Sequence, residues 1–368
     1  MDVNCAHAYA RIVQASAKPP IKSLMLDDAA NALSKWQEPD YRAKQIADWL
    51  YQKRVNSFEA MTDLPQTLRE RLTQEFSFDR LETVRVLGSK DTTQKILFRL
   101  SDGNLIESVL IPASPALYGE RSDRRTICVS TQVGCAYGCK FCASGLDGFS
   151  RNLLPNEIVD QLIAIEQESG EKIDNVVFMG MGEPLANERH VFAAIARLTD
   201  PQAFGLGARH VTVSTVGLVP GIKHLTTAHP QVGLAVSFHA ATDELRSQLV
   251  PPNDLYPLAV LEEAMAGWRS ATHRRPSIEW AMIDRVNDTE EQASLLVPIA
   301  RRLGAHVNLI PLNPTPGYPV VGSSPARIRR FVDVLEGAKV NVTVRDTRGR
   351  SIDAACGQLA LSAQAPSS

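Results

Sequence analysis

Apolar positions recur with two different periods along the chain of 368 residues, and only residues 1–22 lack a clear pattern. Over residues 23–76 apolar side chains recur every three or four positions, which predicts amphipathic helices. Prolines at 39 and 65 interrupt this pattern and divide it into about three short helices. We therefore expect an N-terminal lead-in over residues 1–22 and a small helical domain over residues 23–80.

Within an expected β extension and linker over residues 81–120, the period changes to two between residues 81 and 111, which is typical of half-buried strands. Strands are expected at 83–87, 95–100 and 105–111. Asp102-Gly103 should join the last two as a hairpin, so this segment forms a β extension. Glu107 is a lone acid inside the third strand, and a carboxylate in a half-buried strand ordinarily faces solvent.

Beyond residue 120, strand patterns alternate with helical patterns. Strands are expected through Cys128 and at 174–179, 211–215, 232–239, 277–283, 306–311 and 340–345. Helices are expected from Pro155 to a stop at Gly170 and near 187–199, 257–268, 288–302 and 325–336. Roughly six successive β/α units favour an α/β fold, with a parallel sheet that closes partly into a barrel over residues 121–352. Residues 353–368 are left as a C-terminal loop and a tail that we expect to be disordered.

Polar residues and one glycine directly follow several of these strands: Gly182, Glu183, Ser214, Thr215, Ser237, His239 and Asn313. Each has an ordinary explanation. The serines could cap helices, His239 could be a hydrogen-bonded histidine at the rim, and Asn313 could make a turn before a proline. Because the carboxyl ends of parallel barrel strands meet at one face, we instead expect these residues to share a pocket.

Four of the six cysteines are close in sequence, at Cys128, Cys135, Cys139 and Cys142. The last three form a Cys-x3-Cys-x2-Cys motif. Iron–sulfur clusters are usually held by four thiolates, so three on one loop would leave one iron open to a substrate. Two alternatives stay open. One is a structural zinc site with Cys128 as fourth ligand, although its distance from Cys135 exceeds the usual spacing; the other is a set of unrelated buried thiols.

A further cysteine, Cys356, lies in the loop Asp353-Ala354-Ala355-Cys356-Gly357-Gln358. A lone cysteine is more often a small buried hydrophobic residue than a nucleophile. Its small neighbours in a polar loop would nevertheless leave the sulfur accessible, so Cys356 is a candidate for covalent chemistry.

Composition changes this picture little. The net charge of −2 gives no overall attraction to nucleic acid, so RNA binding would need a local patch. One candidate is the segment from Pro325 to Arg350, where seven Lys or Arg residues stand against three Asp or Glu. The helical N-terminal segment is another, although acidic residues nearly balance its basic ones.

The sequence shows neither a signal-peptide pattern nor a run of apolar residues long enough to span a membrane. We therefore expect a cytoplasmic protein without membrane contact. In a reducing compartment, clustered cysteines indicate metal binding or catalysis more than structural disulfides.

Together these residues carry a family resemblance. Cys135-x3-Cys139-x2-Cys142, with Phe141 before the third cysteine, resembles the cluster motif of radical S-adenosylmethionine (SAM) enzymes. Within that superfamily the chain is similar to the RlmN/Cfr group of RNA-adenosine methyltransferases. The matching stretches cover nearly the whole chain beyond residue 22: 41–46, 128–142, 180–184, 211–217, 308–314 and 352–359.

The resemblance implies a radical SAM partial (β/α)6 barrel and a role for each candidate residue. Cys135, Cys139 and Cys142 would hold one [4Fe–4S] cluster, whose fourth iron binds SAM. The positions that match the SAM contacts of the family are Gly182, Glu183, Ser214, Ser237, Phe238, His239 and Asn313. The catalytic positions are Cys356, which is methylated during turnover, Cys128, which resolves the intermediate, and Glu107 as acid/base.

The family chemistry uses two SAM molecules per turnover. One methylates Cys356 by polar displacement. An electron from the cluster cleaves the second, and the resulting radical removes hydrogen from the new methyl group. The methylene radical adds to the adenine ring, which is too electron-poor to accept a methyl cation. Cys128 then attacks the sulfur of Cys356, which leaves a disulfide and releases the methylated RNA.

The resemblance also implies RNA partners: 23S ribosomal RNA at the peptidyl-transferase centre and tRNA beside the anticodon, both methylated at C2 of adenosine. An external electron donor of the flavodoxin kind is implied, and we expect a monomer. Two alternatives remain. The Cfr kind methylates C8 of the ribosomal adenosine, and a zinc-containing RNA-binding protein without catalysis would use Cys128 as a fourth thiolate.

Overall fold

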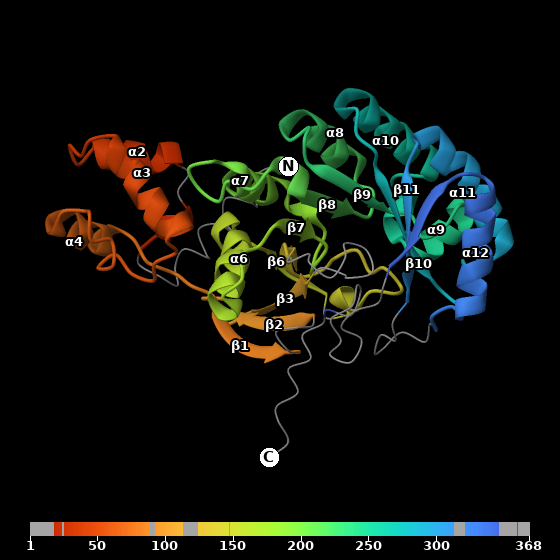
Figure 1. Ribbon diagram of the computed structural model, residues 1–368, viewed down its shortest axis with the longest axis horizontal. Coiled ribbons are helices and arrows are strands. Elements are labelled where there is room, and N and C mark those ends of the chain that lie inside the picture. Colours follow the sequence, from red (N-terminus) through yellow and green to blue (C-terminus); the bar gives the residue numbers. More distant parts are fainter. Residues whose placement is uncertain are drawn as a thin grey trace, which may run out of the picture.

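The computed structural model describes residues 18–23, 26–88, 93–112, 124–146, 148–312, 321–345 and 359. Within them one long mixed sheet forms the centre of the molecule (Figure 1). Its strands, in spatial order, are β1 (Glu82–Leu87), β2 (Gln94–Arg99), β3 (Leu105–Pro112), β4 (Arg125–Cys128), β7 (Asn175–Phe178), β8 (Val211–Thr215), β9 (Gly233–Ser237), β10 (Ser277–Met282), β11 (His306–Pro311) and β12 (Asn341–Val344).

The part of the sheet from β4 to β12 is parallel throughout and forms the partial barrel. Helices on its outer face connect the strands (Figure 1). They are α6 (Pro155–Ser169), α7 (Glu188–Thr199), α8 (Val219–Ala228), α9 (Asp243–Leu249), α10 (Leu258–Thr272), α11 (Glu290–Leu303) and α12 (Pro325–Gly337). The α/β partial barrel predicted from the sequence is thus confirmed, and α6 begins at Pro155 and ends at a left-handed Gly170 as predicted.

The β extension continues this sheet, because β3 pairs with β4 in antiparallel register. β2 and β3 form the predicted hairpin, in which Leu97 faces Glu107. Glu107 is only 3% exposed, so the expectation that it faces solvent is wrong. The reason is that both faces of β3 are covered; on one of them the Ser108 hydroxyl donates a hydrogen bond of 2.6 Å to Gln161 on α6. The domain boundaries expected at 22, 80, 120 and 352 stay predictions.

The N-terminal helices form a separate lobe beside α6 (Figure 1). They are α2 (Leu26–Ser34), α3 (Tyr41–Ala47), which continues into a π-helical turn (Asp48–Gln52), and α4 (Gln66–Glu75). The lobe is attached to the barrel by charged groups. Arg54 pairs with Glu166 on α6, and Arg197 on α7 donates a hydrogen bond of 2.8 Å to the backbone carbonyl of Ser23.

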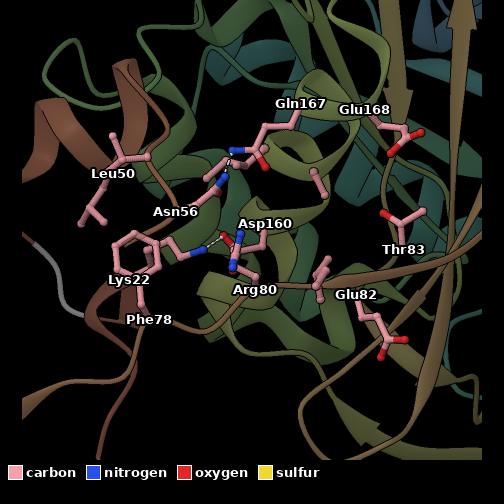
Figure 2. Close-up of a pocket in the computed structure, with 14 residues that line it drawn as sticks. Lys22, Leu50, Asn56, Phe78, Arg80, Glu82, Thr83, Asp160, Gln167 and Glu168 are labelled. Carbon is pink, nitrogen blue, oxygen red and sulfur yellow. Dashed lines mark hydrogen bonds and ion pairs between the residues drawn. The ribbon is translucent and has the colours of Figure 1, made fainter. Parts of the chain in front are cut away.

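A groove lies at this junction, between the N-terminal lobe, residues 78–83 and α6 (Figure 2). The ammonium group of Lys22 lies 2.5 Å from the carboxylate of Asp160, and both side chains are nearly fully buried. Beside this pair, the Gln167 amide donates a hydrogen bond of 3.1 Å to the side chain of Asn56. These contacts fix the lobe against the barrel.

Several short elements were not anticipated from the sequence. β5 (Gln132–Gly134) and β6 (Phe149–Asn152) form a second, two-stranded sheet that frames the cysteine loop. Short 3-10 helices occur at Ile21–Ser23, Ala143–Gly145, Pro184–Asn187, Ala208–His210 and Pro251–Asp254. Among the described residues, no helix has the length and apolar character needed to cross a membrane.

Candidate active site

The loop that carries Cys135, Cys139 and Cys142 runs between β5 and β6. The backbone N–H of Cys135 donates to the carbonyl of Gly148 at 2.9 Å, and that of Cys142 donates to the carbonyl of Cys139 at 3.1 Å. The N–H of Lys140 donates to the carbonyl of Leu249, at the end of α9, at 3.1 Å. The loop is therefore held by its own turns and by a barrel helix.

The three thiols of this loop interact with one another. Burial raises the pKa of Cys135 to about 11, and the nearby charge of Cys142 adds to this effect. Burial also raises the pKa of Cys139 well above its ordinary value, again with contributions from Cys142 and Cys135. Three thiolates so close together need a positive counter-charge, which a metal centre supplies when it displaces their protons. This soft donor set fits an iron–sulfur cluster.

Cys128 lies apart from these three. It packs with Val109, Met181 and Leu359 in one small apolar cluster. Cys139 and Cys142 belong to a different cluster, built around Phe141 and Leu249. In the described part of the chain, no three His, Cys, Asp or Glu side chains converge on one metal ion. The separate packing of Cys128 argues against a zinc site completed by that thiol.

A pocket opens beside Cys142 at the carboxyl ends of the barrel strands. The predicted residues that line it are Gly182, Glu183, Ser214, Thr215, Ser237 and His239. The serines do not cap helices, because α8 starts after Leu218 and α9 starts after Thr242. Phe238 is fully buried in the main core, between two residues that face the pocket. Asn313 and Cys356 lie outside the described residues.

Glu183 provides the carboxylate of this pocket. Its oxygens accept hydrogen bonds from the backbone N–H groups of Leu185, at 3.0 Å, and Val216, at 2.8 Å. Burial raises the pKa of Glu183 to about 7, although these N–H donors and the Thr215 hydroxyl lower it. The side chain is therefore oriented by hydrogen bonds and will hold its negative charge best opposite a bound cation.

Gly182 shapes the floor beside Glu183. Its φ of +94° lies in a region that residues with a Cβ rarely adopt, and a Cβ here would lie 2.5 Å from the Cβ of Gln132. Gln132 itself accepts a hydrogen bond of 2.9 Å from the backbone N–H of Glu183. The glycine therefore lets the turn that carries Glu183 approach Gln132 on β5 closely, and it keeps space free next to the carboxylate.

His239 is wholly buried and lines the pocket, so the alternative of a histidine at the rim is wrong, although the ring is hydrogen-bonded. Its Nδ1 accepts a hydrogen bond of 2.8 Å from the backbone N–H of Ala281. Burial lowers the pKa of His239 to about 3, and the charge of Arg246 lowers it further. The ring is therefore neutral and carries its proton on Nε2. It lies against the ring of Phe141, with the centroids 4.3 Å apart.

Sequence reasoning missed two charged residues that also line the pocket, Glu279 and Arg345. Glu279 lies on β10 in register with Ser237 and Asn308, and its carboxylate accepts a hydrogen bond of 2.9 Å from the Asn308 amide. Burial raises its pKa, and the charge of Arg345 opposes this shift. A lone acid inside an apolar strand marks Glu279 as it marks Glu107, so the same signal could have found it.

Glu107 lies on β3, next to the strand that ends in Cys128. Its carboxylate is 3.1 Å from the ammonium group of Lys95, and both side chains are buried. The Ser130 hydroxyl donates a hydrogen bond of 2.5 Å to the backbone carbonyl of Glu107 and accepts one of 2.9 Å from the N–H of Met181. Ser130 thus connects the β extension to the turn that carries Glu183.

Two sequence families match separate parts of the chain. Residues 26–77 match the "Ribosomal RNA large subunit methyltransferase N-terminal domain", and residues 129–271 match the "Radical SAM superfamily". A protein of Akkermansia muciniphila named "Probable dual-specificity RNA methyltransferase RlmN" is 47% identical over 321 residues, which cover 87% of this chain and 89% of that protein. The chain belongs to the RlmN family. An RlmN protein of Opitutus terrae is 44% identical and covers 94% of the chain and 95% of its own length.

The structure agrees with this membership. It superimposes on a radical SAM methyltransferase from Sphaerobacter thermophilus with a TM-score of 0.87 at 43% identity, over 93% of this chain and 99% of the other. The chain is therefore a radical SAM RNA methyltransferase of the RlmN type, as the resemblance to the RlmN/Cfr group predicted. Enzymes of this superfamily work with a [4Fe–4S] cluster and SAM.

Proposed function

We propose that this RlmN-family enzyme methylates C2 of adenosine in 23S ribosomal RNA, at the peptidyl-transferase centre, and in tRNA, beside the anticodon. The transfer runs through a methyl group carried on Cys356. The observation that carries this proposal is the position of Cys128, which packs with Leu359 and not with the cysteine loop. Leu359 follows Cys356 by three positions, and three residues of chain reach at most about 11 Å. This limits the distance of Cys356 from the Cys128 cluster, and we propose that the two thiols meet during the reaction.

The cysteine loop and the pocket would hold the cofactors. Cys135, Cys139 and Cys142 would bind three irons of the cluster, and the fourth would face the pocket and take SAM. Bound there, the cluster and SAM supply methyl groups and a hydrogen-abstracting radical, with two SAM molecules consumed per product. The carboxylate of Glu183 suits the ammonium group of SAM, and the Nε2–H of His239 offers a hydrogen-bond donor. Ser214, Ser237, Asn313 and the backbone at Phe238 complete the contacts.

Three residues of the chain would carry the transfer. The Cys356 thiolate takes a methyl group, loses a hydrogen atom from it, and becomes bonded through the remaining CH2 to the adenine ring. The ring radical formed in this step would return one electron to the oxidised cluster, and Glu107 would take the proton from the substituted ring carbon; Lys95 stabilises the charged form of Glu107. The Cys128 thiolate would then attack the sulfur of Cys356: the S–S bond forms, the S–CH2 bond breaks, and the released CH2 carbon takes up a proton to become the methyl group of the product. A thiol reductant must then reduce this disulfide to regenerate the thiols of Cys128 and Cys356, and a separate flavodoxin-like protein would supply electrons to the cluster.

The RNA would reach the site as an unstacked adenosine, because a barrel interior cannot admit a paired base. The basic segment after Pro325 is a weaker contact surface than its composition suggested. Arg327 is paired with Asp288 at 2.6 Å, Arg329 is paired with Asp333 at 3.0 Å, and Arg345 lines the pocket. The N-terminal lobe, whose family is named for ribosomal RNA methyltransferases, is the better candidate. We propose a cytoplasmic monomer.

The choice of C2 over C8 rests on the relatives, whose names place them with RlmN and describe dual specificity. The experiment is an anaerobic reaction of the cluster-loaded enzyme with SAM and each RNA, followed by mass spectrometry of the nucleosides. 2-Methyladenosine in both RNAs supports the proposal. 8-Methyladenosine would instead indicate the Cfr kind of reaction. A zinc-containing RNA-binding protein without catalysis does not fit a radical SAM methyltransferase family.

A further inference from the structure

Helix α9 is a short helix between β9 and α10 that packs against the cysteine loop. Leu249 at its end accepts the hydrogen bond from Lys140, and Leu245 and Leu249 belong to the same apolar cluster as Cys139 and Phe141. Thr242 caps the N-terminus of the helix, because its hydroxyl accepts a hydrogen bond from the backbone N–H of Leu245. Helix α9 therefore lies against the cysteine loop, and one charged side chain points inward from it.

Arg246 is that side chain, and it is only 1% exposed. Its Nη2 donates hydrogen bonds to two backbone carbonyls, that of Val216 at 2.7 Å and that of Ser237 at 3.0 Å. Val216 follows β8 and Ser237 ends β9, and both line the pocket. One guanidinium group thus links the ends of two neighbouring barrel strands behind the cofactor pocket.

Arg246 is itself held in place by Asn253. Nη1 of Arg246 donates a hydrogen bond of 2.9 Å to Oδ1 of Asn253. The amide of Asn253 in turn donates to the carboxylate of Asp243 at 3.0 Å, and this carboxylate also accepts the N–H of Leu258 at 2.8 Å. The guanidinium group is therefore oriented by a chain of hydrogen bonds that runs out to the start of α9.

The positive charge of Arg246 interacts electrostatically with Cys139 in the cysteine loop. Burial lowers the pKa of Arg246 to about 10, and the charges of Cys139 and Asp243 oppose that shift, so the side chain is protonated at neutral pH. Arg246 in turn opposes the rise in the pKa of Cys139 that burial causes. Burying an arginine is costly unless its hydrogen bonds and charge are used. Here both terminal nitrogens of Arg246 donate hydrogen bonds, while Nε is buried without a partner.

We propose that Arg246 is a positioning residue of the cofactor site, which fixes the ends of β8 and β9 around SAM and makes the cluster easier to reduce by holding a fixed positive charge on the helix that packs against the cysteine loop. A nearby cation stabilises the more negative, reduced form of a cluster. This inference rests on the proposed role of Cys139 as a cluster ligand. If Cys139→Ala keeps its iron, the proposed site fails; if it loses iron, the tests of Arg246 stand independently.

The test uses the full chain, loaded with cluster under anaerobic conditions, and two readouts: the midpoint potential of the cluster, followed by electron paramagnetic resonance, and the equilibrium binding of SAM. Arg246→Gln removes the charge. We expect the equilibrium constant for reduction of the cluster to fall about tenfold in this variant, which lowers the midpoint potential by ~59 mV for a one-electron couple. Arg246→Lys keeps the charge but cannot bridge two carbonyls in the same way, so its potential should stay unchanged while SAM binding weakens severalfold. The matched control is Arg301→Gln, at an exposed arginine on α11, which should change neither readout.

An Arg246→Gln enzyme with a full cluster and an unchanged potential would overturn the inference, as would a lysine variant whose potential falls as far as that of the glutamine variant. If Arg246→Gln does not fold, the lysine variant decides. For Arg246→Lys, an unchanged potential together with weaker SAM binding supports the inference, and SAM binding equal to that of the wild type overturns it.

Discussion

Cys128 and Leu359 pack in the same small apolar cluster, although one ends the first barrel strand and the other lies near the end of the chain. This contact links the thiol of Cys128 to the segment that carries Cys356. On this basis we propose two different tasks for the four clustered cysteines. Three of them lie on the loop after β5, and the fourth packs with Leu359.

Replacing Cys128 should therefore stop the reaction late. Cys128→Ala should keep the iron content of the wild type but fail to release product, because no thiolate remains to attack the sulfur of Cys356. We expect RNA to accumulate covalently attached to the protein, detectable as a species of low mobility on a denaturing gel. Cys139→Ala is the matched control and should lose its iron. Loss of iron from Cys128→Ala would contradict the division of the thiols.

Replacing Cys356 should stop the reaction early. Cys356→Ala should bind a full cluster and cleave SAM but leave both RNAs unmethylated, because no sulfur is present to carry the methyl group. Nucleoside mass spectrometry measures the product, and iron content confirms the cluster. Methylated RNA from this variant would show that the methyl group reaches adenosine by another path.

The buried pair of Lys95 and Glu107 should contribute strongly to stability. Glu107→Gln leaves the ammonium group of Lys95 buried without its counter-charge, and we expect the free energy of unfolding to fall by about 3 kcal/mol. The neighbouring pair of Glu82 and Arg99, at 3.0 Å, is a matched control because both side chains are largely exposed. Glu82→Gln should cost at most about 1 kcal/mol. Denaturant unfolding measures both values, and equal losses would refute this expectation.

The pair of Lys22 and Asp160 should hold the N-terminal lobe on the barrel (Figure 2). Asp160→Asn should weaken this attachment by about 3 kcal/mol, because the Lys22 ammonium group stays buried at the junction. We expect faster proteolytic cleavage between the lobe and the barrel, at residues 78–83. Asp48→Asn disrupts an exposed pair with Lys53 in the same lobe and should not change the cleavage rate. Equal cleavage of the two variants would argue against this role.

SAM binding should depend on pH through Glu183. Its pKa of about 7 in the protein without SAM means that the carboxyl group is largely protonated below neutral pH and cannot pair with the ammonium group of SAM. Affinity should therefore rise about tenfold per pH unit below pH 7 and level off above it. Glu183→Gln should bind more weakly and without this dependence. Equilibrium binding between pH 5.5 and about pH 8.5 tests this, and a wild type with flat affinity would contradict the assigned partner.

Much of the fold was predictable because buried parallel strands are apolar runs and helix ends carry their own signals, as at Pro155 and Gly170. The exposure of Glu107 was misjudged because a strand pattern cannot show that the face of β3 opposite to α6, which carries Glu107, is covered as well. The short helices α8 and α9 were missed since a few turns give little periodicity.

The candidate site was predictable where residues follow strand ends and not where partners are distant in sequence. Ser214, Ser237 and His239 were found from their position after strands. Arg246 was missed because its proposed role depends on the backbone carbonyls of Val216 and Ser237. These lie at the ends of two strands, whereas Arg246 lies on a helix. No local pattern shows which backbone groups a buried arginine will meet.

The most direct test of the methyl relay is the isotope content of the product. The cluster-loaded enzyme reacts with each RNA and with SAM that carries a fully deuterated methyl group. The masses of the product nucleosides are then measured by mass spectrometry. The proposed relay predicts 2-methyladenosine whose new methyl group holds two deuterium atoms, because one is removed while the group is on Cys356. A methyl group that keeps all three deuterium atoms would show direct transfer and contradict the relay.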